Sequence, residues 1–130
     1  MKTKIPVLFL LASLLLTGCS TMADAVQARG TGTKVIYQAS FADIWAALPQ
    51  VVTDAGLKFV SANPADRSVL AQRGMTAFSY GENVAIFVEK IEPSGSSVEV
   101  VSKKAVATTI FAPDWAKPIF EQLDKKFKRG

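Results

Sequence analysis

Residue types that enzyme and metal chemistry commonly use are scarce in this chain. Its 130 residues include no histidine and a single cysteine. The missing imidazole excludes Ser-His-Asp triads, histidine-based zinc sites and the most common general base. One cysteine cannot form a disulfide within the chain, so the fold has to be stabilised by its hydrophobic core. The carboxylates show no catalytic or metal-ligand spacing. We therefore expect no enzyme activity, no catalytic residue, no metal site and no cofactor.

A long apolar run is also missing, but a short one stands near the N-terminus. Lys2 and Lys4 precede an apolar stretch over residues 7–16, which is ten residues long. A membrane-spanning helix needs about 20 apolar residues, so this stretch is too short to be one. A basic start, a short apolar stretch and small residues are typical of a signal peptide. The pattern predicts a signal peptide over residues 1–18, cleaved between Gly18 and Cys19.

The end of that segment, Leu16-Thr17-Gly18-Cys19, resembles the lipobox of bacterial lipoprotein signal peptides. The resemblance implies that the Cys19 thiol takes a diacylglyceryl group and that the mature protein begins at this residue. The lipid bilayer then becomes a partner through acylated Cys19. The sorting rule that accompanies the resemblance retains lipoproteins with aspartate after the cysteine in the inner membrane. Ser20 therefore favours the outer membrane, with the protein on its periplasmic side.

Removal of the signal peptide leaves 112 residues and lowers the net charge from +4 to +2, because Lys2 and Lys4 are lost. This length suits one domain. The near-neutral charge gives no reason to expect nucleic acid as a partner. Residues 19–33 are small and polar, with room for a short helical turn at 22–28. We expect them to form the lipidated cysteine and a flexible tether, and residues 34–130 to fold as a single domain without it.

The mature chain alternates between strand and helix patterns. Apolar residues recur at helical spacing from Phe41 to Ala55, after a capping serine, Ser40, and a second helix begins near residues 113–114. Strands are predicted at residues 34–38, 57–62, 68–73, 84–92 and 98–104, whereas residues 74–83 fit either strand or loop. The order is β-α-β-β-β-β-α. It predicts an α+β fold, with an antiparallel sheet of about four to five strands and two helices packed on one face. The other face would be solvated or would meet a partner.

Several structural motifs together resemble a family of small, largely uncharacterised bacterial lipoproteins. They are Phe41-Ala42-Asp43-Ile44-Trp45, the Gly56 helix stop, the hairpin of residues 84–92 and 98–104, and Ala112-Pro113-Asp114-Trp115. The layout is more loosely similar to the helix-grip domains of the accessory lipoprotein in the outer-membrane β-barrel assembly machinery. These likenesses concern structure, and a shared fold does not transfer function.

Two functional hypotheses follow. The first is a membrane-anchored, non-enzymatic accessory or protein-interaction module of the bacterial envelope, with Phe78 and Tyr80 as candidate contacts for an envelope protein. The second is a carrier or sensor of a small apolar ligand, held between helices and sheet in a cleft lined by Phe41, Trp45, Trp115 and Phe120. Core packing explains the two tryptophans better, because both lie on apolar stripes. Glu89 and Glu99 are assigned to a solvated face of the hairpin.

Overall fold

The computed structural model describes residues 21–74, 81–104 and 114–130. The predicted signal peptide, Cys19 and the candidate contacts Phe78 and Tyr80 lie outside these ranges. The described elements, in chain order, are α2 (Met22–Gln27), β1 (Thr33–Tyr37), α3 (Phe41–Asp54), β2 (Lys58–Asn63), β3 (Ser68–Arg73), β4 (Glu82–Ile91), β5 (Gly95–Lys104) and α4 (Ala116–Asp124).

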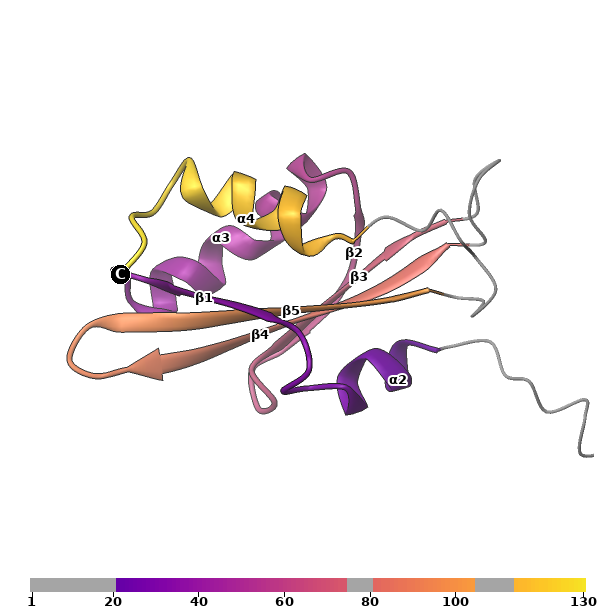
Figure 1. Cartoon of the computed structure of the whole chain (residues 1–130), viewed down its shortest axis with the longest axis horizontal. Coiled ribbons are helices and arrows are strands. Elements are labelled where there is room, and N and C mark those ends of the chain that lie inside the picture. The colour runs from indigo at the N-terminus through magenta and orange to yellow at the C-terminus, as the bar shows by residue number, and fades with distance from the viewer. Residues whose placement is uncertain (1–20, 75–80, 105–113) are drawn as a thin grey trace, which may run out of the picture.

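The strands form one five-stranded antiparallel sheet in the order β1-β5-β4-β3-β2, as Figure 1 shows. This confirms the predicted α+β class and the antiparallel sheet. Glu82 is in register with Arg73 on one side and with Lys104 on the other, so these three residues mark one end of the sheet, called here the Lys104 end. Ile91 pairs with Gly95 at the opposite end, the Gly95 end, where β4 turns into β5.

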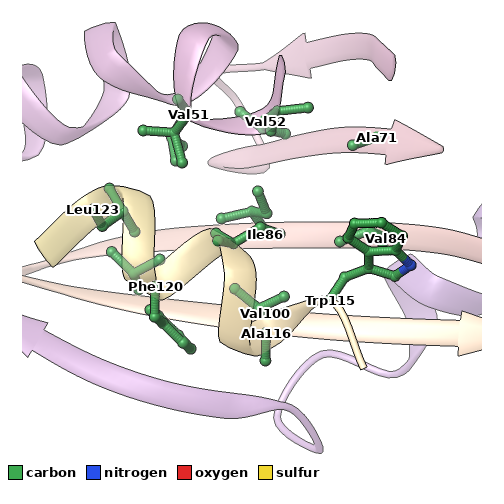
Figure 2. Packing of buried hydrophobic residues seen from close by; sticks show 14 of the residues in the cluster. Val51, Val52, Ala71, Val84, Ile86, Val100, Trp115, Ala116, Phe120 and Leu123 are labelled. Carbon is green, nitrogen blue, oxygen red and sulfur yellow. The ribbon is translucent and has the colours of Figure 1, made fainter. Parts of the chain in front are cut away.

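Helices α3 and α4 cover the same face of the sheet (Figure 1), as the periodicity predicts. The α3 helix begins after Ser40, whose side-chain oxygen accepts a hydrogen bond of 3.1 Å from the Asp43 N–H. The buried stripes of the two helices meet strand residues at a shared core (Figure 2). This core includes Ile44, Leu48, Val51 and Val52 of α3, Ile119, Phe120 and Leu123 of α4, and Val84, Ile86, Val98 and Val100 of the sheet.

The third helix, α2, lies on the opposite face of the sheet (Figure 1). Its Ala25 is fully buried in a second apolar cluster with Ala85, Phe87 and Val101. The Thr21 side chain caps the helix in a reciprocal capping box with Asp24. The helix lies within the short turn that the sequence allowed at residues 22–28. Its packing corrects the described part, residues 21–33, of the flexible tether expected over residues 19–33. It also corrects the expectation that this sheet face is solvated or meets a partner. On this face the two central strands place the apolar side chains of Ala85, Phe87 and Val101, so both faces of the sheet have apolar surface to bury.

A buried carboxylate holds the segment after α2 against the sheet. Glu99 is 4% exposed, and its carboxylate accepts hydrogen bonds of 2.8–3.0 Å from the backbone N–H groups of Gly30 and Gly32. Gly30 has a φ of +94°, which glycine adopts at low cost. A Cβ on Gly32 would lie 2.3 Å from the Val100 carbonyl oxygen, so the approach requires glycine. The predicted solvated position of Glu99 is therefore wrong.

Candidate functional site

The two edge strands of the sheet, β1 and β2, differ in whether their outer backbone groups are hydrogen-bonded. At the β1 edge the C-terminal residues add a short extension, because Gln38 donates its N–H to the Lys128 carbonyl at 2.8 Å and Gly130 donates to the Ile36 carbonyl at 2.9 Å. Tyr37 and Arg129 form the bridge between these bonds. The chain end therefore occupies backbone groups of β1 that would otherwise be open to another strand.

Side chains fix this C-terminal extension in place. Arg129 binds both carboxylate oxygens of Asp124, at 2.9 and 2.8 Å, and the Tyr37 hydroxyl donates to the same carboxylate at 2.9 Å. The Arg129 hydrogen bond holds the pKa of Asp124 below its usual range. Burial, followed by the bond to Asp124, raises the pKa of Tyr37. Asp124 thus accepts as an anion at neutral pH while Tyr37 stays protonated and donates.

The β2 edge, Lys58–Asn63, is open by contrast. β2 is the last strand of the sheet, and all six of its residues are exposed. Phe59 is 37% exposed and Val60 is 45% exposed, which makes them two of the three large apolar residues that stand out from the described surface. No backbone hydrogen bond from the described residues reaches the outer side of this strand. Open strand edges can pair with an extended segment of another chain.

A β-bulge shapes the β2 edge. Phe59 pairs with Ala71 and Ser61 pairs with Leu70, so Val60 is the extra residue between two consecutive partners. A bulge bends its strand and redirects a side chain, and bulges are frequent at sheet edges and beside functional sites. Val60, the residue at the bulge, is 45% exposed.

The aromatic residues proposed for a ligand cleft do not come together around a shared space. Trp115 and Phe120 are each 5% exposed and belong to the core. Phe41 and Trp45 are partly buried and stack on each other, with ring centroids 5.4 Å apart. A groove of about 380 Å³ beside β1 and α4 includes Phe120, but Asp114, Lys117, Glu121 and Arg129 also line it. Its rim is too charged for a purely apolar ligand.

The hairpin carboxylates lie on the face that α2 covers. Glu89 pairs with Ser97 and Glu99 pairs with Phe87, so the two carboxylates are diagonal rather than opposite. Arg29 lies between α2 and β1 and binds Glu89 at 2.9 Å, with its guanidinium 4.6 Å from the Phe87 ring centre. These contacts fix the helix on the sheet. This arrangement was not predicted from the sequence. The only sequence feature that points to it is the pair of glycines, Gly30 and Gly32, that follows the capped helix α2.

Within residues 21–74, 81–104 and 114–130, no three side chains of the metal-ligating types come close enough to hold an ion. None of the helices in these ranges has the length and apolarity needed to cross a membrane.

Comparison with known proteins gives information about the fold only. The chain matches no protein-family model, and a comparison with curated proteins gives no match. Among solved structures, it is similar to a chain in the crystal structure of the adenylate sensor from AMP-activated protein kinase in complex with 5-aminoimidazole-4-carboxamide 1-beta-D-ribofuranotide (ZMP). The TM-score is 0.50 at 11% sequence identity, and the match covers 72% of this chain and 94% of that chain. At this identity the likeness shows a shared fold and nothing about ligands.

Proposed function

We propose that this protein is a lipid-anchored, non-enzymatic lipoprotein of the bacterial envelope. In this proposal, acylated Cys19 holds the domain on the periplasmic side of the outer membrane, and the domain binds another envelope protein. The anchoring rests on the Leu16-Thr17-Gly18-Cys19 pattern and the short apolar stretch before it. Two or three acyl chains are needed for stable anchoring, since a single chain binds a bilayer only reversibly.

The β2 edge is the observation that supports a protein-binding role. The same sheet has one edge occupied by Lys128–Gly130 and one edge open with Phe59 and Val60 exposed. We propose that an extended segment of a partner protein adds a sixth strand along β2. The backbone would provide hydrogen bonds, and the apolar side chains at the bulge would provide specificity. This site is proposed in addition to the candidate contacts Phe78 and Tyr80, which lie outside the described residues.

The apolar-ligand carrier has less support. It requires a cavity among Phe41, Trp45, Trp115 and Phe120, and two of these side chains are buried in the core. We therefore retain the protein-binding module as the function that the geometry favours.

Placing a lysine at the bulge should abolish partner binding. Val60→Lys puts a charge in the middle of the proposed contact, where an added strand would have to desolvate it. Because Val60 is already 45% exposed, the free energy of unfolding should change by no more than about 0.5 kcal/mol. In intact envelopes, we expect the amount of partner protein crosslinked to the Val60→Lys variant to be at least tenfold lower than the amount crosslinked to the wild type. Quantitative mass spectrometry measures both amounts.

The matched control is Ala46→Lys, which adds the same charge at an exposed position of α3, away from the β2 edge. It should leave crosslinking unchanged. Equal crosslinking by Val60→Lys and the wild type would contradict the proposed site. If the β2 edge crosslinked only to a second copy of this chain, the edge would serve self-association rather than binding of an envelope protein.

A further inference from the structure

The position of α2 has a consequence for how the domain stands on a membrane, provided that Cys19 is lipidated as proposed. Ala25 packs against Ala85 and Val101, and four residues later Arg29 reaches Glu89. The helix therefore runs along β4 towards the Gly95 end of the sheet. The N-terminal end of α2, which Thr21 caps, therefore lies towards the Lys104 end, and Figure 1 shows this end of the helix on the side where β5 ends.

The link between this helix and the anchor is very short. Cys19 precedes Thr21 by two residues, which span at most about 7 Å even when fully extended. The ten residues of β5 extend about 30 Å from the Gly95 end to the Lys104 end. The link is thus several times shorter than the sheet, and it is attached to a helix that Glu99 and the second apolar cluster hold against the sheet. A domain attached in this way cannot turn freely around its anchor.

We infer that the Lys104 end of the sheet rests on the phospholipid headgroups of the bilayer and that the Gly95 end points away from it. The side chains at this end suit a headgroup layer rather than hydrocarbon, because charges of both signs gather there. They include Arg73, Lys103 and Lys104 of the strands and the exposed Asp24 of α2. The β2 edge begins at this end, since Lys58 pairs with Gln72 next to Arg73, so the partner's added strand would lie close to the membrane surface.

Quenching from the bilayer tests this orientation. Two variants of the full chain that each gain one free thiol, Lys104→Cys and Ser94→Cys, place a fluorophore at the two ends, and both positions are exposed. The native thiol does not interfere, because lipidation consumes it and the chain has one cysteine. The purified lipidated proteins are inserted into phosphatidylethanolamine–phosphatidylglycerol vesicles that carry a headgroup-labelled quencher. We expect quenching at Lys104→Cys to exceed that at Ser94→Cys several-fold.

An insertion tests whether the short link between Cys19 and Thr21 causes the difference in quenching between the two ends. Twenty glycine and serine residues placed between Ser20 and Thr21 add a flexible chain of roughly 25 Å, which should make quenching at the two ends nearly equal. Equal quenching without the insertion, or an unchanged difference with it, would overturn the inferred orientation. Intact-mass measurement of the same samples tests the premise separately, since a chain without acyl groups would contradict the proposed anchoring itself.

Discussion

A chain that begins at Gly32, without residues 21–31, is expected to be about 3–6 kcal/mol less stable than one that begins at Thr21. Removing α2 exposes Phe87 and Val101, which are 2% and 3% exposed in the intact domain. Full burial of each such side chain contributes about 1.5–3 kcal/mol. Against a usual total stability of about 5–15 kcal/mol, this loss is large. Urea unfolding of the two chains, followed by far-UV circular dichroism, measures it.

The Glu99 carboxylate provides an internal control for this prediction. In the chain beginning at Thr21, Glu99→Ala leaves the part-buried N–H groups of Gly30 and Gly32 without their carboxylate acceptor, at a cost of about 1–3 kcal/mol. In the chain beginning at Gly32, α2 and Gly30 are absent, so the same substitution should cost much less. Equal urea midpoints for the two starting chains would show that residues 21–31 are a tether after all.

Trp115→Ala is expected to destabilise the domain by about 3–5 kcal/mol, the usual cost of truncating a buried aromatic side chain. The indole is 5% exposed in the core beneath α4, and the Arg73 guanidinium lies 5.1 Å from its ring centre. Its Nε1 has no hydrogen-bond partner among the described residues, so its contribution comes from packing. Differential scanning calorimetry should show a much lower midpoint.

Two comparisons make this result specific. Trp115→Phe retains most of the apolar volume and should cost clearly less than the alanine variant. Trp45→Ala should also cost less, because Trp45 is only partly buried and stacks on Phe41 at the side of the core. If Trp115→Ala kept wild-type stability but abolished partner or ligand binding, the tryptophan would belong to a functional cleft, and the carrier hypothesis would be favoured.

Local periodicity was sufficient to predict most of the fold. The α3 stripe and its Ser40 cap, the β4–β5 hairpin and the α4 stripe all depend on residues close together in the sequence, and the structure confirms each of them. The strand order was not predictable, because it depends on pairing between distant strands. β2 could therefore be recognised as an open edge only from the structure.

The largest error concerned the segment after Cys19. Its small, polar composition resembles a linker, yet Glu99 binds Gly30 from 69 residues away and α2 covers Phe87. Neither contact leaves a periodic signal in residues 21–33. The buried Glu99 was also misassigned, because an alternating charge on a strand normally faces solvent. The anchor itself lies outside the described residues, so the Cys19 lipidation remains a prediction from sequence.

The anchoring of the protein through Cys19 is tested most directly by the mass of its N-terminal peptide after isolation from bacterial envelopes. We predict a peptide that begins at Cys19, lacks residues 1–18 and carries a diacylglyceryl thioether. The Cys19→Ser variant should show neither the lipid nor normal cleavage. A wild-type N-terminal peptide that retains residues 1–18, or that begins at Cys19 with a free thiol, would contradict the proposed function.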